Sequence, residues 1–178
     1  MKVPNKNKKY VISFCRRICP GSQCTYIPVD PLPDKPLDEC FSIVPKHIIS
    51  YGGEQKFGWS IWHWRKVFIE AEFHSIWKRP DGTLIDITPK LLPFNQILFL
   101  PDPHRRYEGR QIDNIREPIS NDPLVKEFIV LAKERHREMN KSDLADQHGL
   151  VIVSRRVEEI DYQMKQIGFA LMEKFGPP

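Results

Sequence analysis

A histidine and an aspartate on two neighbouring predicted strands are the residues of this sequence best suited to chemistry. His74 lies in an aromatic and β-branched run, and Asp86 follows it after the turn Pro80-Asp81-Gly82. Pro80 and Asp81 suit the central positions of a type I turn, and Gly82 suits the left-handed position that follows. The sequence therefore predicts a hairpin with a three-residue, bulged loop.

The length of this loop decides whether the two side chains meet. A three-residue loop pairs Arg79 with Thr83 and places Ile76 opposite Asp86. His74 is then a diagonal neighbour of Asp86 on the same face of the sheet. A two-residue loop would shift the register by one and send Asp86 to the opposite face. The turn thus predicts an imidazole and a carboxylate within reach of each other.

An imidazole oriented by a carboxylate is the base of a nucleophilic site, which also needs a thiol or a hydroxyl. Cys40 is the best candidate because it lies near the start of a predicted helix, where the helix dipole stabilises a thiolate. Asp38 and Glu39 beside it oppose that effect. A free cysteine is also commonly a buried, small apolar residue, so both interpretations of Cys40 stay open.

The order Cys40, His74, Asp86 resembles the transglutaminase-like branch of the papain-like thiol hydrolases. In that family a Cys opens a helix that packs on an antiparallel sheet, a His starts a strand, and an Asp lies before a Pro on the next strand. The matching segments here read D-E-C-F, E-F-H-S-I-W and L-I-D-I-T-P, and they fall within roughly residues 36–90. The resemblance implies a thiol-dependent hydrolase or acyltransferase acting on an amide, peptide or isopeptide bond, without a cofactor.

The resemblance also implies a role for each residue. His74 would deprotonate Cys40, and Asp86 would fix the imidazole tautomer. Residues expected to bind substrate are Trp59, Trp62 and Glu72, although the tryptophans also suit a core. Candidate donors to an oxyanion are Gln55, the Trp59 indole and the Cys40 backbone amide.

Metal binding is a second interpretation of the same strand face. Glu70, Glu72, His74 and Asp86 supply nitrogen and oxygen ligands, and His63 can contribute from the neighbouring strand. Such a set suits zinc, manganese or iron.

The other cysteines offer a separate metal site. Cys15, Cys19 and Cys24 have the spacing of part of a zinc knuckle, with Cys40 as a candidate fourth ligand. In that case Cys40 would be structural and zinc would be the cofactor.

A third interpretation is a non-catalytic module that binds nucleic acid or a protein. The net charge is +4, with basic residues concentrated in residues 1–17 and in the segment 101–106. Basic and aromatic side chains together form stacking platforms for nucleic acid. No recognised nucleic-acid motif is present, so we expect a peptide or amide substrate as the partner.

The helices and strands that must position these residues follow from the sequence pattern. The pattern predicts an α+β fold with a central antiparallel sheet, an N-terminal helix and two C-terminal helices. Residues 1–35 read as a basic, cysteine-bearing extended segment with one short strand near residues 10–14. Residues 36–122 read as the core, and residues 123–178 as helices packed on it in a single domain. The expected strands are 57–64, 67–77, 83–87 and 96–100.

The helices follow from apolar spacing and breakers. Pro36 suits a helix start and Gly52 a helix end, with Pro45 as an interruption. Two stripes of apolar residues predict two helices. The first runs from Pro123 to about Asn140. The second carries the apolar residues from Val157 to Leu171 and ends at about Lys174. Residues 101–122 read as a charged loop.

No segment has the roughly 20 apolar residues of a membrane helix, and residues 10–15 are too short for the apolar region of a secretory signal. We therefore expect a cytoplasmic protein without membrane association, whose four cysteines are reduced. The sequence specifies neither the oligomeric state nor the substrate.

Overall fold

The computed structural model describes residues 1–110, 112–141 and 153–178. The fold is α+β, with an N-terminal helix, an antiparallel sheet and two C-terminal helices, which confirms the predicted fold class. The elements in chain order are α1 (Lys9–Ile18), β1 (Thr25–Pro28), α2 (Cys40–Tyr51), β2 (Glu54–Trp64), β3 (Phe68–Lys78), β4 (Leu84–Ile85), β5 (Gln96–Pro101), β6 (Ile115–Pro118), α3 (Pro123–Met139) and α4 (Arg155–Phe175).

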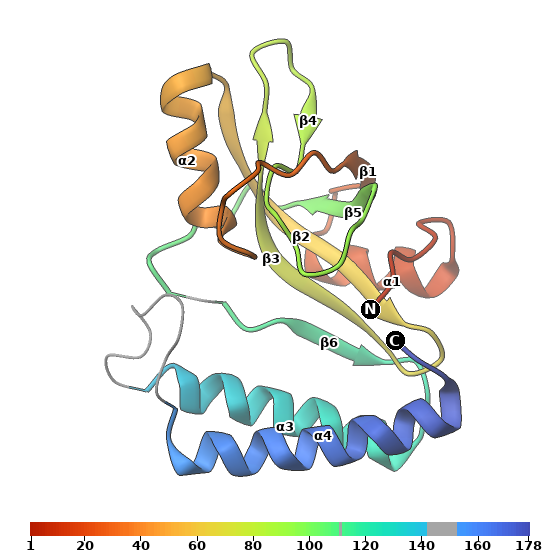
Figure 1. Ribbon diagram of the computed structural model, residues 1–178. Coiled ribbons are helices and arrows are strands. Elements are labelled where there is room, and N and C mark those ends of the chain that lie inside the picture. Colours follow the sequence, from red (N-terminus) through yellow and green to blue (C-terminus); the bar gives the residue numbers. More distant parts are fainter. Residues whose placement is uncertain (111, 142–152) are drawn as a thin grey trace. The chain divides into compact units, whose positions relative to one another are not determined.

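The strand order in the sheet is β1-β5-β2-β3-β4, and β6 pairs with β3 (Figure 1). Strand β5 pairs antiparallel with both β1 and β2, and β3 pairs antiparallel with β4. After β4, an isolated parallel bridge joins Asp86 to Val29. The short strand β4 is therefore followed by a segment that returns to β1.

The chain divides into two compact units. One unit contains residues 1–2, 63–70 and 107–178, and the other contains residues 3–62 and 71–106. All three residues of the predicted triad fall in the second unit. The predicted boundaries at 35 and 122, and the packing of the C-terminal helices on the core, stay predictions.

In the first unit, α3 and α4 lie side by side (Figure 1). Both begin at a capping side chain, because Asp122 accepts a hydrogen bond from the Leu124 amide (2.9 Å) and Ser154 accepts one from the Val157 amide (3.4 Å). Their apolar faces share a core with the end of β2, the turn that follows it and the start of β3. The buried residues of this core are Trp64, Val67, Phe68, Val125, Ile129, Leu131, Ile160, Ile167 and Leu171. Among the described residues, no helix is both long and apolar enough to cross a membrane.

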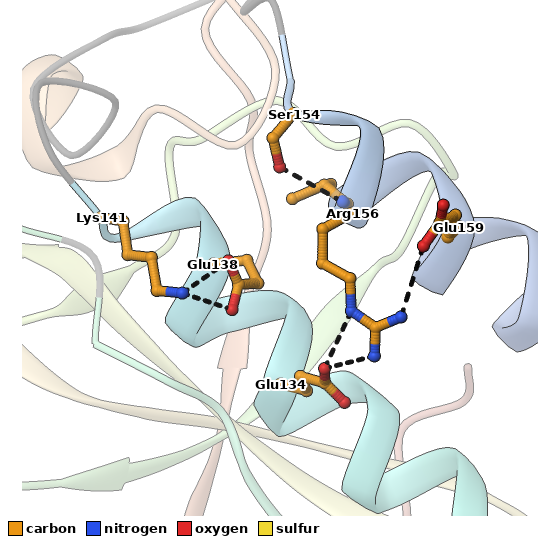
Figure 2. Close-up of polar contacts among 7 residues, drawn as sticks. Glu134, Glu138, Lys141, Ser154, Arg156 and Glu159 are labelled. Carbon is orange, nitrogen blue, oxygen red and sulfur yellow. Dashed lines mark hydrogen bonds and ion pairs between the residues drawn. The ribbon is translucent and has the colours of Figure 1, made fainter.

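Ion pairs join the two helices on their outer side. The Arg156 guanidinium donates to Glu134 of α3 through two nitrogens and also reaches Glu159 one turn further along α4 (Figure 2). Lys141 pairs with Glu138 in the same region. Exposed pairs of this kind contribute little to stability, so the shared apolar core is the main attraction between α3 and α4.

The predicted strand near residues 10–14 is wrong, because this segment belongs to helix α1. The buried residues Val11, Phe14 and Cys15 recur at spacings of three and four and form one face of the helix. A short apolar run does not distinguish a strand from a buried helical turn by itself.

Two strands lie where the sequence predicts coil. Strand β1 falls in the predicted extended segment and pairs with β5, and β6 falls in the predicted loop 101–122 and pairs with β3. Both are four residues long. Elements this short depend on their partner strand more than on local preference.

Helix α2 begins at Cys40 and not near Pro36. Asp38 has a φ of 59°, a left-handed conformation that a helix cannot include, and its amide donates to the carbonyl of Pro89 (2.9 Å). Pro45 lies inside α2 without ending it. Contacts of Ile43 and Val44 with the hydrophobic residues of β3 and β4 offset the lost backbone bond.

The predicted hairpin register is confirmed. The Arg79 amide donates to the Thr83 carbonyl (2.8 Å), and the Gly82 amide donates to the Arg79 carbonyl (2.9 Å). Gly82 has a φ of 89°, as the bulged loop requires. Beyond the turn, Lys78 pairs with Leu84, and Trp77 pairs with Ile85.

We predict that Gly53→Ala strongly destabilises the unit that carries α2. Gly53 has a φ of 90°, and an added Cβ would lie 2.2 Å from the Lys78 carbonyl oxygen and 2.7 Å from the Trp77 indole nitrogen. Both neighbours belong to β3, so the helix-to-strand connection must shift. The expected loss is more than about 3 kcal/mol in the free energy of unfolding, measured by chemical denaturation.

Gly82→Ala is the matched control. Gly82 has nearly the same φ, but an added Cβ there meets nothing within 4 Å. Only the conformational cost of about 1–2 kcal/mol is expected. Equal losses for the two variants would contradict the close approach of Gly53 to β3.

Candidate functional site

The structure brings His74 of β3 and Asp86 together. Both side chains are almost completely buried, and the His74 Nε2 lies 3.0 Å from the Asp86 Oδ2. The attraction between the two groups is mainly coulombic, with a smaller contribution from hydrogen bonding. The other carboxylate oxygen of Asp86 accepts a hydrogen bond from the Thr88 amide (3.0 Å). The carboxylate is therefore held from two sides.

The backbone of Asp86 is fixed as firmly as its side chain. The ladder between β3 and β4 ends at Ile85, and the Asp86 amide donates to the carbonyl of Pro28 (3.0 Å). The Asp86 carbonyl accepts from the amide of Asp30 (2.9 Å). The end of β1 and the residues after it thus hold Asp86 where its carboxylate contacts the imidazole.

Burial and charge act in opposite directions on this pair. Burial alone would lower the pKa of His74, but the carboxylate of Asp86 and the thiol group of Cys40 outweigh it and raise that pKa to about 10. For Asp86, burial favours the neutral acid, yet the imidazolium of His74 holds the pKa of the carboxyl below its usual value. At neutral pH the pair is therefore an imidazolium and a carboxylate.

Cys40 is the first residue of α2 and is 2% exposed. Its sulfur lies within electrostatic range of His74 and of Lys90. The Cys40 carbonyl accepts a hydrogen bond from the hydroxyl of Ser75 (3.1 Å), which anchors the start of α2 on β3. Among the described residues, no hydrogen bond joins the thiol of Cys40 to His74, and the interaction between these two groups is electrostatic.

Lys90 is a site residue that the sequence analysis did not select. Its side chain is only 8% exposed, and its ammonium lies 3.6 Å from the carboxylate of Asp38 and 5.8 Å from the centre of the Trp62 ring. Burial lowers the pKa of Lys90, but the surrounding anionic groups, Glu72 first among them, raise it above its ordinary value. No feature of the neighbouring sequence indicates that Lys90 is buried.

The predicted substrate-binding residues make contacts within the chain. The Trp62 indole donates to the carboxylate of Glu72 (2.9 Å), which places both of these residues beside Lys90. The Trp59 side chain is fully buried, and its indole donates to Asp102 (3.0 Å). Trp59 is therefore a core residue, and a substrate-binding role for it would require that it move.

The candidate oxyanion donors differ in whether they already donate to another group of the protein. The Trp59 indole is used by Asp102, and the Gln55 amide donates to the hydroxyl of Ser75 (3.0 Å). The Cys40 amide lies in the first turn of α2, where backbone donors have no partner within the helix. It is the candidate donor best placed to face a group bound at the sulfur.

The metal-binding interpretations have no support among the described residues, where no three His, Cys, Asp or Glu side chains gather as ligands. Glu70 forms an ion pair with Arg116 of β6 instead. The four cysteines are free thiols.

We predict that the ion pair makes stability depend on pH in a defined window. The pKa of His74 is about 10 in the folded protein and about 6.5 in an unfolded chain, so its contribution is complete below pH 6.5 and declines as the pH rises toward 10. Asp86→Asn should remove this slope, which is up to about 1.4 kcal/mol per pH unit. It should also cost about 3 kcal/mol at pH 7 by leaving a buried imidazole without its partner.

Urea denaturation of both proteins between pH 6.5 and pH 9.5 measures the slope. Asp81→Asn is the control, because Asp81 is an exposed turn residue whose acceptor role for the Thr83 amide an asparagine keeps. Parallel pH profiles for the wild-type protein and Asp86→Asn would contradict the ion pair.

Comparisons with protein-family models, with curated proteins and with solved structures found no match to this chain. The resemblance to the transglutaminase-like thiol hydrolases therefore stays a prediction.

Proposed function

We propose that this protein is a thiol-dependent hydrolase or acyltransferase acting on an amide, peptide or isopeptide carbonyl, with Cys40 as nucleophile. The observation that supports it is the buried ion pair of His74 with Asp86, with the thiol at the start of α2 within electrostatic range of the imidazole. A cysteine, an imidazole and an orienting carboxylate are the components of nucleophilic acyl transfer.

In this proposal the two nitrogens of His74 have different tasks. Nε2 faces the carboxylate of Asp86, which leaves Nδ1 for the thiol of Cys40. In the first step the Cys40 proton passes to solvent, because the imidazolium of His74 already carries both ring protons, and the sulfur attacks the carbonyl carbon beside that imidazolium. The carbonyl π electrons move to oxygen, where the Cys40 amide can donate to the developing charge.

Collapse of this intermediate breaks the carbon–nitrogen bond and leaves an acyl thioester on Cys40. The imidazolium of His74 gives its proton to the departing amine. Water, or a second amine, then attacks the thioester and returns a proton to His74, and the freed thiolate takes a proton from solvent. The carboxylate of Asp86 stays ionised throughout and orients the ring.

The electrostatics of the site help the second half of the reaction. The Cys40 group is one cause of the raised pKa of His74. A thioester carries no such charge, so acylation lowers the pKa of His74. A larger fraction of the His74 ring is then neutral in the acyl-enzyme, and the neutral ring can take a proton from the attacking water.

Access decides which substrates react. Cys40 and His74 are each 2% exposed, so a substrate reaches the sulfur only when covering side chains move. Lys90, Trp62 and Glu72 form a neighbouring polar and aromatic group suited to hold a substrate amide. A cytoplasmic setting, as the sequence predicts, would keep the thiol reduced.

We predict that Cys40 forms a thioester with a small activated ester, p-nitrophenyl acetate, at pH 7.5. In a Cys24→Ser background, which removes the partly exposed thiol of lowered pKa, intact-mass spectrometry should show one acetyl group, and peptide mapping should place it on Cys40. The acetylation rate should fall at least about a hundredfold in Cys40→Ala and about tenfold or more in His74→Gln. Cys19→Ser is the matched control, since Cys19 is a buried cysteine outside the triad, and should react as the wild-type protein does.

Circular dichroism spectra identify any variant that fails to fold. For that case, the relative alkylation of the four wild-type cysteines by iodoacetamide gives a second measurement. Acetylation and alkylation that bypass Cys40 in the folded wild-type protein would refute the proposal.

A further inference from the structure

Two cysteines outside the candidate triad share a small cavity. Cys15 lies near the end of α1 and is buried, and Cys24, just before β1, is partly exposed. Both line a cavity of about 280 Å³. The connection between them turns back through Gly21, whose φ of 88° favours glycine. The fold thus brings two free thiols together at one opening.

The two thiols differ in ionisation. A hydrogen bond from the Cys15 thiol outweighs burial and lowers the pKa of Cys24 to about 7, and the ammonium of Lys6 acts in the same direction. The same contact, together with burial, raises the pKa of Cys15. Cys24 is therefore the nucleophile of the pair, and Cys15 is a thiol held ready beside it.

Cys19, the third cysteine of this region, is engaged elsewhere. It is 3% exposed, and its thiol donates to the hydroxyl of Ser22 (3.2 Å). Unlike Cys15 and Cys24, Cys19 is not among the residues that line the cavity.

The charge around the cavity indicates the reaction partner. Lys6 and Arg16 line it together with the two thiols, and no acidic residue is among the lining residues. Such an opening suits a small molecule that carries carboxylates.

We propose that Cys24 and Cys15 form a dithiol exchange site for anionic low-molecular-weight disulfides, which closes to an intramolecular disulfide. The Cys24 thiolate attacks one sulfur of the small disulfide, forms a mixed disulfide and releases one small thiolate. Cys15 then loses its proton and attacks the Cys24 sulfur, which forms the Cys15–Cys24 bond and releases the second small thiolate. Two protein thiols are oxidised, and one external disulfide is reduced to two thiols.

Glutathione disulfide is the probe that tests this proposal. The reduced protein is incubated with it at pH 7, quenched with acid, alkylated and digested with trypsin without reduction. Cleavage after Arg16 separates Cys15 from Cys24 in the sequence. A disulfide-linked pair of peptides containing Cys15 and Cys24 is expected in the wild-type protein and in Cys40→Ala, so the result does not depend on the proposed acyl transfer.

Variants separate the two steps. Cys15→Ser should stop at a mixed disulfide of Cys24 with glutathione, and Cys24→Ser should form neither product. Cys19→Ser is the matched control and should close as the wild-type protein does. A mixed disulfide that accumulates on Cys19, or loss of closure in Cys19→Ser, would overturn the assignment.

A variant of Lys6 tests whether the positive charge at the cavity selects anionic disulfides. Lys6→Gln should slow the reaction with glutathione disulfide several-fold and slow the reaction with the uncharged 2-hydroxyethyl disulfide less. Equal slowing with both reagents would refute selection of anionic disulfides.

Discussion

The buried ion pair of His74 with Asp86 is the interaction on which the rest of the candidate site depends. Two ionised groups out of water are costly unless each is the other's partner and further donors satisfy the carboxylate. Asp86 meets both conditions through the imidazole and the Thr88 amide. The same pairing keeps the imidazole protonated near neutral pH, which is the property that the proposed chemistry uses.

One short segment connects the pair to the other parts of the site. Residues 86–90 run beside residues 30–38, with backbone hydrogen bonds from the Asp30 amide to the Asp86 carbonyl, from the Leu32 amide to the Ile87 carbonyl, and from the Asp38 amide to the Pro89 carbonyl. This segment carries both the carboxylate and the ammonium of Lys90. It also fixes the left-handed Asp38, after which α2 begins at Cys40. The start of the nucleophile helix and the acid of the pair are therefore set by the same backbone contacts.

The sequence was most informative where local chemistry determines geometry. The turn Pro80-Asp81-Gly82 fixes the number of loop residues and the position of φ > 0, so the register and the shared face of His74 and Asp86 could be predicted. Elements that depend on partners far away in the chain were missed. Helix α1 buries one face of a run too short to show its period, and β6 exists because it pairs with β3.

The same limit applies to the site residues. Nothing in the local sequence distinguishes Lys90 from an exposed lysine, because its burial follows from Asp38 and Trp62, which lie far from it in the chain. The spacing of Cys15 and Cys24 suggested a metal knuckle, and only the path of the chain through Gly21 shows the two thiols as a pair. The catalytic roles of Cys40, His74 and Asp86 stay a proposal.

The most direct measurement is an NMR titration of the His74 ring nitrogens in uniformly ¹⁵N-labelled protein. The account predicts that His74 shows the shifts of an imidazolium through pH 8 and loses its proton with a midpoint near 10. The midpoints of His63 and His136, whose pKa values burial lowers, should lie below 6.5 in the same spectra. A midpoint for His74 at or below 6.5 would contradict the buried ion pair.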